Sequence, residues 1–351
     1  MKLIGSDSKE SPLYPRYANL TQGERFQRLF EQSKARAHYF GLARAAAYNK
    51  SSSMNPDIVC PPVKYMENGN YYIAELSSST YRRIPCQNLD VCDAGHCEHG
   101  FCTYKQGYVS GPETSGHLAY ERFTMNSDTG ARESVESIIM GCGINQRNFG
   151  PVLGVPDIRE GDRDFPPPKP APGTAPIAGI LGLGQGASNF SLVLQLDIEK
   201  RFEYCLEAYD VQGIKFSHTY LRFGHDTIIG EGPEVLKTPI IQNPNFGTPY
   251  HLILEDISVA NRRLGFQKSD FELKPDGTGG TIIDSGDPFT IMIRPHFERV
   301  KQALLEYFED FGIYSAGPAH GFDPCFHLSA DLVEYPEMTF HFQGADVGVY
   351  I

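Results

Sequence analysis

The sequence lacks both a long apolar run and an excess of basic residues. Nothing in its 351 residues resembles a transmembrane span, and the opening stretch MKLIGSDSKESP has no apolar run of the kind that marks a signal peptide. The formal net charge is −12, with 31 lysines and arginines against 43 aspartates and glutamates. Phosphate binding needs clustered basic side chains, so this composition argues against a nucleic-acid partner. No membrane partner is predicted either.

Glycine, proline and aromatic residues are abundant. The chain has 35 glycines, 25 prolines, 19 tyrosines and 22 phenylalanines, and 40% of it is hydrophobic. Such a composition favours short strands and many turns over a helical bundle. The length suffices for a large core in one large or two medium domains, so the sequence predicts a mostly β protein.

Strand-like segments alternate with turn residues over most of the chain. They are YYIAEL (71–76), GHLAYERFTM (116–125), SVESIIMGCG (134–143), YLRFG (220–224), YHLILEDISV (250–259) and GTIIDSG (280–286). The proline-rich stretch 157–176 is predicted to be a surface loop, because its prolines cannot join an interior sheet.

Two helices are predicted beside these strands. The first runs from Thr21 to about Tyr48, because Thr21 and Glu24 have capping-box spacing. Its apolar residues recur near one face, and they are Phe26, Leu29, Phe30, Ala37 and Phe40. The second follows Pro295, with Phe297, Val300, Leu304 and Phe308 expected to face inward.

Charge is distributed unevenly along the chain. Residues 21–50 hold six basic and two acidic side chains, so a segment of charge +4 stands in a chain whose remainder carries −16. Such a segment is suited to electrostatic docking on the acidic remainder.

Eight cysteines are present, and four of them lie between residues 86 and 102. The stretch CDAGHCEHGFC (92–102) mixes cysteine with histidine, but its spacings match no standard zinc finger, so we expect disulfides rather than a metal site. Glycosylation sequons begin at Asn19, Asn49 and Asn189. Together these features indicate an oxidising, secretory compartment.

The stretch GLGQGA (182–187) formally satisfies the dinucleotide-binding fingerprint G-x-G-x-x-A. A proline-rich loop precedes it, however, and no clear βαβ unit surrounds it. We therefore interpret it as a tight glycine-rich packing motif and predict no cofactor.

The stretch GGTIIDSGDPFTIM (279–292) carries the sharpest chemical signal. It is predicted to form a buried strand, Thr281–Ile283, that ends at Asp284 and turns at Ser285 and Gly286. The glycine permits a sharp bend and lets the backbone approach the carboxylate. An aspartate held in this way is suited to be half of a dyad in which two carboxylates share a proton and activate water.

These motifs together resemble the plant pepsin-like aspartic proteases of the nepenthesin type. GTGGTIIDSG (277–286) is similar to the family's second active-site motif, and CTYKQGYVSGPETSGHLAYERFTM (102–125) to its flap region. Further landmarks follow in the family's order: IIMGCGINQRNFG, AGILGLGQGASNFSLVLQL, FEYCL, LRFG, LEDISVANRRLGFQKSDFEL and YPEMTFHFQGADV. The stretch SPLYPRYANLTQGERFQRL (11–29) resembles the prosegment, which shields the acidic cleft in that family.

The resemblance implies a pepsin-like bilobal fold. Residues 1–68 would form a prosegment-like basic helix and linker, residues 69–205 the N-terminal lobe, and residues 206–351 the C-terminal lobe. It further implies a secreted, apoplastic or vacuolar zymogen that acts as a monomer on protein or peptide substrates.

The resemblance also assigns site residues. Asp284 would be catalytic, with Ser285 and Gly286 supporting it. Tyr108 aligns with the flap tyrosine, although YVSGPE departs from the family's YGDGS.

The family pattern is incomplete in both lobes. Leu76 passes directly to Ser77, where relatives carry a strand that ends in the first catalytic D-T-G-S. The family's closing strands, which would follow Ile351, are missing from this sequence. The absence of central strands would leave apolar residues without neighbours and so lower the stability of the fold. Cys205 and Cys325 would lose the partners that they have in the family.

Two aspartates are candidate substitutes for the missing partner. Asp128 begins the sequence D-T-G-A (128–131), but Asn126 and Ser127 precede it, so no buried strand delivers its carboxylate. Asp287 lies only three residues from Asp284 on the same turn, so the two cannot face each other from two lobes. The family has Ser or Thr at that position, and a carboxylate there would repel Asp284.

Three hypotheses follow for the function. The chain is by family an aspartic endopeptidase, and we expect it to be inactive or impaired because it lacks the first aspartate. Alternatively it is a non-catalytic pseudoprotease that binds peptides or inhibitors. A homodimer that joins two Asp284 residues is the third, and the remaining N-terminal lobe would obstruct it.

Overall fold

The structure is a computed structural model that describes part of the chain. The described residues lie within 20–34, 64–65, 71–72, 78–107, 113–126, 131–147, 182–185, 201–205, 220–227, 235–243, 249–319, 322–327 and 335–350, with short gaps inside some of these ranges. The chain divides into two compact units. Residues 1–20 and 53–230 form the first unit, and residues 21–52 and 231–351 form the second.

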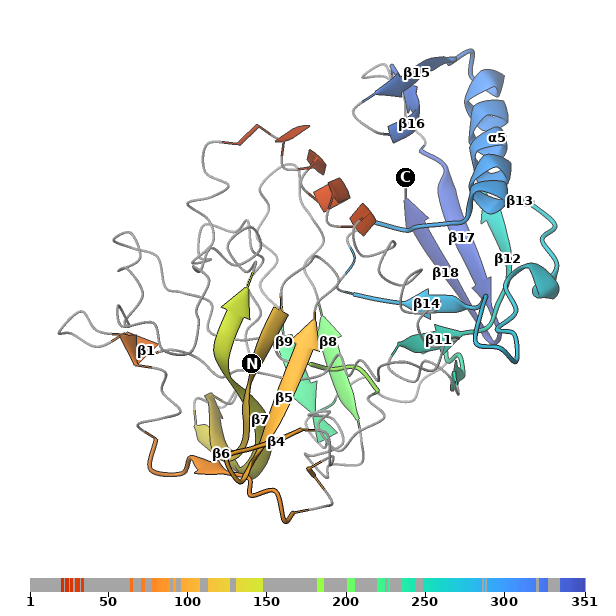
Figure 1. Cartoon of the computed structure of the whole chain (residues 1–351). Helices are drawn as coiled ribbons and strands as arrows, with labels where there is room; N and C mark the ends of the chain where they lie inside the picture. The colour runs from red at the N-terminus through yellow and green to blue at the C-terminus, as the bar shows by residue number, and fades with distance from the viewer. Residues whose placement is uncertain are drawn as a thin grey trace. The chain divides into compact units, whose positions relative to one another are not determined.

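The fold is mostly β, as predicted, and antiparallel pairing dominates both units. In the first unit, three long strands form one sheet (Figure 1): β5 (Phe101–Gly107), β6 (Glu113–Asn126) and β7 (Arg132–Arg147). The short strands β3 (Arg82–Arg83) and β4 (Cys97–Glu98) pair with β6 and β5. These bounds confirm the strands predicted at 116–125 and 134–143.

One face of this sheet is packed and closed. Ile84 and Cys102 are fully buried, and Tyr104 and Leu118 lie beside them. The smallest side chain is required at Gly116, because a Cβ there would collide with the backbone carbonyl of Cys142 on the neighbouring strand. Glycine therefore lets β6 and β7 approach closely.

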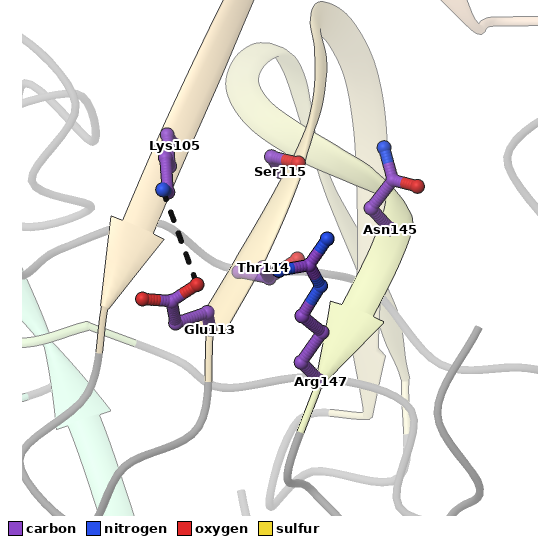
Figure 2. Close-up of a pocket in the computed structure, with 6 residues that line it drawn as sticks. All are labelled: Lys105, Glu113, Thr114, Ser115, Asn145 and Arg147. Carbon is purple, nitrogen blue, oxygen red and sulfur yellow. Dashed lines mark ion pairs between the residues drawn. The ribbon is translucent and has the colours of Figure 1, made fainter. Parts of the chain in front are cut away.

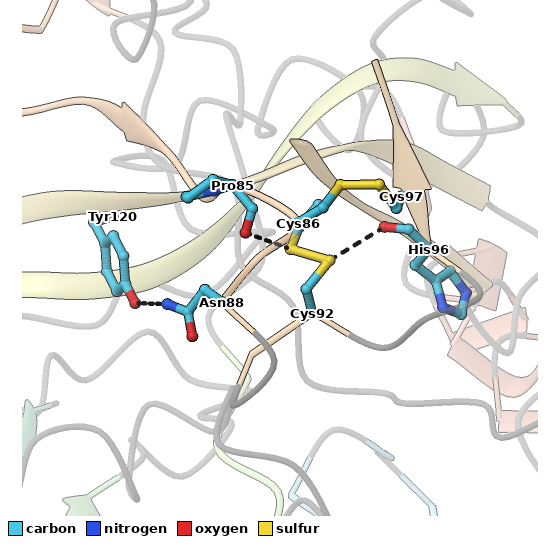
Figure 3. The surroundings of a disulfide bond; sticks show 8 residues. Pro85, Cys86, Asn88, Cys92, His96, Cys97 and Tyr120 are labelled. Carbon is cyan, nitrogen blue, oxygen red and sulfur yellow. Dashed lines mark hydrogen bonds between the residues drawn. A yellow bond between two sulfur atoms is a disulfide. The ribbon is translucent and has the colours of Figure 1, made fainter. Parts of the chain in front are cut away.

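Two disulfides close the stretch that mixes cysteine with histidine (Figure 3). Cys86 bonds to Cys97 and Cys92 to Cys102, with Cα separations of 5.8 and 5.4 Å. They tie β4 and β5 to the segment that precedes them. The expectation of disulfides in this stretch is confirmed. Among the described cysteines, Cys205 and Cys325 have no disulfide partner, which agrees with the expected loss of their family partners.

The second unit contains a four-stranded sheet in the order β13-β12-β17-β18. Its strands are β12 (Leu254–Val259), β13 (Arg262–Arg263), β17 (Glu337–Phe342) and β18 (Ala345–Tyr350). Helix α5 (Arg294–Asp310) packs on it and buries Val300, Ala303 and Phe308. Phe297 and Leu304 are half-buried, so the predicted helix and its inward face are confirmed.

The remaining elements are short. A three-stranded sheet joins β10 (Ile240–Ile241), β11 (Tyr250–Leu252) and β14 (Thr281–Ile283) in that order. Three two-stranded pairs complete the described strands: β1 (Lys64–Tyr65) with β2 (Tyr71–Tyr72), β8 (Phe202–Cys205) with β9 (Tyr220–Phe223), and β15 (Ser315–Ala319) with β16 (Phe322–Phe326). The 3-10 turn η3 spans Lys268–Asp270.

The first predicted helix is present where it is described. The described residues between 23 and 34 are helical, and residues 35–48 lie outside the described part. The Thr21 backbone N–H donates to Glu24 Oε2 at 2.8 Å, and the Glu24 N–H donates to Thr21 Oγ1 at 3.3 Å. This reciprocal pair is the predicted capping box. We call residues 23–34 the N-terminal helix.

Several predictions fall outside the described residues, including the proline-rich loop at 157–176. Residues 182–185 of the glycine-rich stretch lie in no helix or strand. Within the described part of the chain, no helix combines the length and the apolar character needed to cross a membrane.

Substitution of Gly116 tests the close approach of β6 and β7. We expect Gly116→Ala to destabilise the protein by about 1–3 kcal/mol, because the backbone of Cys142 must move to admit the methyl group. Gly107→Ala is the matched control, since a Cβ there meets nothing within 4 Å. It should be neutral, or stabilising by up to about 1 kcal/mol. Urea unfolding of the two variants measures the difference, and equal midpoints would contradict the explanation.

Candidate active site

Strand β14 delivers Asp284 to the surface of the second unit. The strand pairs antiparallel with β11, with Ile282 opposite His251. Asp284 follows directly and is half-exposed, and its carbonyl accepts a hydrogen bond from the Asp287 N–H at 3.1 Å. The chain therefore doubles back immediately after Asp284, which is the predicted strand and turn.

The prediction that this strand is buried is wrong. Ile283 is 52% exposed, and Thr281 and Ile282 are only half-buried. The physical reason is that β14 lies at the edge of its sheet, where β11 is its only partner among the described residues. Ile291 and Ile293, which follow the turn, are 48% and 61% exposed. Ile283, Ile291 and Ile293 are therefore not covered by a neighbouring strand among the described residues.

A buried polar pair, His251 and Asn243, holds the loop before β14 in place. His251 on β11 is fully buried, and its Nδ1 lies 3.3 Å from the carbonyl oxygen of Pro249. Because a carbonyl only accepts, Nδ1 carries the proton and Nε2 accepts from Asn243 Nδ2 at 3.5 Å. Asn243 also donates to the Gly277 carbonyl at 3.1 Å. These bonds attach β11 to the loop that leads into β14.

Close packing fixes the start of β14. Gly280 has φ +77°, and a Cβ there would lie 3.1 Å from His251 Cδ2 and 3.3 Å from the Leu273 side chain.

The sequence analysis did not predict His251 and Asn243, because isolated polar residues in a strand-like segment give no signal. Gly280 and its neighbours were the available clue, since paired glycines before a strand indicate a close approach.

Asp287 is engaged by the N-terminal helix. The Ser33 hydroxyl donates to Asp287 Oδ1, and the Phe289 N–H donates to the same oxygen at 3.3 Å. Ser33 is 2% exposed although it is polar. The turn that follows Asp284 is therefore covered by a segment more than two hundred residues earlier in the sequence.

An aromatic cluster reinforces this contact. The Phe30 ring lies 5.1 Å from Phe322 and 6.5 Å from Phe289, and the last two rings are 5.7 Å apart. Such edge-on and tilted pairs contribute about 0.5–1.5 kcal/mol each beyond the area they bury. For the described residues of the N-terminal helix, the contacts with this turn include a hydrogen bond and aromatic packing. The expectation that the basic segment docks through charge stays a prediction, because Lys34 is the only one of its six basic residues that the structure describes.

Most of the other predicted site residues lie where the structure gives no description. Ser285 is exposed, while Gly286, Tyr108 and Asp128 lie outside the described residues. Strands β6 and β7 pair through to Asn126 and Arg132, on either side of the D-T-G-A sequence. That pairing places the sequence between two antiparallel strands.

A second constellation in the same unit has the composition of a serine-hydrolase triad. Ser258 Oγ lies 2.7 Å from His341 Nε2, and His341 Nδ1 lies 2.9 Å from Asp346 Oδ1. The Nδ1 atom nevertheless has no aligned hydrogen-bond partner among the described residues, so the contact with Asp346 is only electrostatic. Ser258 is 5% exposed within the sheet. A nucleophile needs access to its substrate, so we interpret these residues as a cross-strand polar link.

Two family models match the chain. One, described as "Xylanase inhibitor N-terminal", covers residues 58–156, and the other, "Xylanase inhibitor C-terminal", covers residues 249–351. Together they cover more than half of the chain. The first range includes strands β1 to β7, and the second includes the Asp284 turn.

Curated relatives are aspartic proteinases of plants. Nepenthesin-1 of Nepenthes gracilis is 30% identical over 276 residues, which is 77% of this chain and 54% of the relative. Nepenthesin-2 of the same plant is 29% identical over 271 residues, 76% of this chain and 53% of the relative. The chain thus spans about half the length of these two relatives.

A further alignment supports an internal gap. A probable aspartic protease of Arabidopsis thaliana is 25% identical over 393 positions, covering 99% of this chain and 81% of the relative. These are more positions than the 351 residues of the chain, so the relative carries residues with no counterpart here.

Solved structures show the same fold. The crystal structure of edgp superposes with a TM-score of 0.59 at 18% identity, covering 85% of this chain and 74% of the other. Basic 7S globulin from soybean gives a TM-score of 0.53 at 17% identity, covering 85% and 73%.

Removal of the Ser33 hydroxyl tests the docking of the N-terminal helix. A hydrogen bond to a charged acceptor contributes about 1.5–3 kcal/mol, so Ser33→Ala should speed amide hydrogen exchange in residues 23–34 by about tenfold or more. Lys34→Ala is the control, because Lys34 is an exposed neighbour on the same helix. Unchanged protection in Ser33→Ala would show that the hydroxyl does not hold the helix.

Proposed function

Because the chain belongs to the plant pepsin-like aspartic protease family, we propose that it is a member that keeps one catalytic aspartate, Asp284, and has lost peptide hydrolysis. One observation carries this proposal. D-S-G stands at the end of β14, in the position of the family's second motif. Leu76 is followed directly by Ser77, at the point where relatives carry the strand that ends in D-T-G-S. The support for Asp284 itself comes from the family motif and from the strand and turn that present it.

The proposed loss follows from the chemistry of the dyad. In a complete site, two carboxylates share a proton and bind a water molecule between them. One accepts the proton of the attacking water, while the other polarises the scissile carbonyl. A single Asp284 can fill one of these roles but not both. Asp287 does not replace the partner, because it stands on the same turn and accepts hydrogen bonds from Ser33 and Phe289.

A second candidate function is peptide or inhibitor binding without cleavage. The exposed side chains of Ile283, Ile291 and Ile293 favour it, because they place apolar surface on both sides of the Asp284 turn. An extended peptide could bind to that surface without being cleaved.

From the family we also propose that the protein is secreted, monomeric and zymogen-like, with the N-terminal helix as its prosegment. The two disulfides agree with an oxidising compartment.

Proteolysis at acid pH tests the main proposal. We expect the purified chain to hydrolyse an unfolded protein no faster than the Asp284→Ala variant, since one carboxylate cannot complete the dyad. Release of new amino termini measures the rate. Activity that is present in the original chain and disappears in Asp284→Ala would overturn the proposal.

Binding of a statine-type peptide separates the two candidates. A retained peptide site predicts saturable binding that weakens in Asp284→Ala, because the statine hydroxyl is designed to contact the catalytic carboxylate. Calorimetry measures the affinity, and a cooperative thermal transition shows that the chain is folded. No binding by a folded chain would exclude the peptide-binding alternative while leaving the loss of hydrolysis in place.

A further inference from the structure

We propose that strands β5, β6 and β7 carry a binding pocket for a carboxylate group. The pocket has a volume of about 200 Å³ and is lined by Lys105, Glu113, Thr114, Ser115, Asn145 and Arg147 (Figure 2). All of these residues belong to the first unit. The inference therefore does not rest on Asp284, although Lys105 and residues 113–115 lie in the stretch that resembles the family's flap region.

Strand register explains why five of these side chains meet, whereas the Thr114 side chain stands between the two rows and points to the other face. Lys105 pairs with Ser115, and Ser115 pairs with Asn145, so the three stand in one row across the sheet. In the next row, Glu113 pairs with Arg147. Side chains two residues apart on a strand share a face, so both rows face the same way.

The opposite face of the same strands is buried, so the backbone beneath the pocket belongs to a packed sheet. Gln106 and Thr114 are 1% and 5% exposed, and the Thr114 hydroxyl lies 3.1 Å from Tyr104 Oη. The pocket face is instead open, because Gly107 has no side chain and a Cβ there would meet nothing within 4 Å. A ligand group on this face would thus meet side chains held by a packed sheet.

The charges in the pocket favour an anion. Lys105 Nζ and Glu113 Oε2 are 3.9 Å apart, and their side chains are 69% and 45% exposed, so this ion pair is weak. Among the described residues, the Arg147 guanidinium has no carboxylate partner and no hydrogen bond. Two cations and one carboxylate leave the pocket with a net charge of +1, in a chain of net charge −12.

The donors match a carboxylate in kind. A guanidinium offers a planar pair of N–H groups that fits a carboxylate, and an ammonium adds a point charge. The Ser115 hydroxyl and the Asn145 amide stand beside them on the same face (Figure 2). The Ser115 hydroxyl can supply a further hydrogen bond to a bound anion.

Charge, rather than size, favours a monoanion. Water occupies about 30 Å³ per molecule in the liquid, so a pocket of about 200 Å³ has room for a carboxylate and for a phosphate alike. A single excess positive charge suits a carboxylate, whereas Glu113 would repel the second charge of a phosphate dianion. The source of the carboxylate is either an acidic side chain of a peptide or a free small carboxylate.

Titration with matched peptides tests the pocket. The probes are an acetylated and amidated Gly-Glu-Gly peptide, its Gly-Gln-Gly counterpart, sodium acetate and inorganic phosphate. We expect the glutamate peptide to bind, with affinity that falls as sodium chloride is added, and the glutamine peptide not to bind. Acetate binding as tight as that of the peptide would identify a free carboxylate as the source, and tighter peptide binding would identify an acidic side chain.

Paired charge variants give the controls. Arg147→Gln should weaken binding of the glutamate peptide by about tenfold or more, because it removes the bidentate donor. Arg132→Gln makes the same change at the other end of β7 and should leave the affinity unchanged. Glu113→Gln should tighten acetate binding and allow phosphate to bind. Thermal unfolding of each variant checks that the sheet is intact.

Three results would overturn the proposal. Absence of binding at millimolar probe by the folded chain would exclude the pocket. Equal weakening in Arg147→Gln and Arg132→Gln would show a general charge effect, and equal binding of the glutamate and glutamine peptides would show that the carboxylate is not recognised.

Discussion

The antiparallel pairing of β14 with β11 is the constraint on which the candidate active site depends. It fixes where the strand ends, and so where Asp284 leaves the sheet and the chain turns. The buried His251 and Asn243 hold the preceding loop against β11, so the position of Asp284 follows from hydrogen bonds made several residues away. The same pairing leaves the other side of β14 without a described partner. The site is thus well anchored on one side and open on the other, as a single half of a two-part site would be.

The N-terminal helix and the Asp284 turn form one local assembly. Ser33 is bonded to Asp287, and Phe30 lies against Phe289 and Phe322, so the helix covers the position where the family has a hydroxyl residue. An aspartate there offers an acceptor that a serine hydroxyl can donate to. In this chain the departure from the family's pattern thus coincides with a contact that holds the helix.

Local signals predicted much of this arrangement. The capping box at Thr21 and Glu24, helix α5 and the strand before Asp284 could all be predicted, because each depends on residues within a few positions of one another. The exposure of Ile283 could not, because it depends on which strand lies next in the sheet. The Ser33 contact joins residues 254 positions apart, so no local pattern contains it. The pocket of Lys105 and Arg147 likewise required the register of three strands, which the sequence alone did not specify.

The open edge of β14 also bears on solubility. An edge strand presents unpaired backbone donors and acceptors, and among the described residues no strand pairs with the second edge of β14. Ile283 adds exposed apolar surface there, so a strand of another molecule could pair with this edge. Proteins commonly protect such edges with charge, and here the net charge of −12 makes copies of the chain repel one another. Salt screens that repulsion over about 10 Å at 0.1 M ionic strength. The colloidal behaviour of the protein is therefore tied to ionic strength through the edge of one three-residue strand.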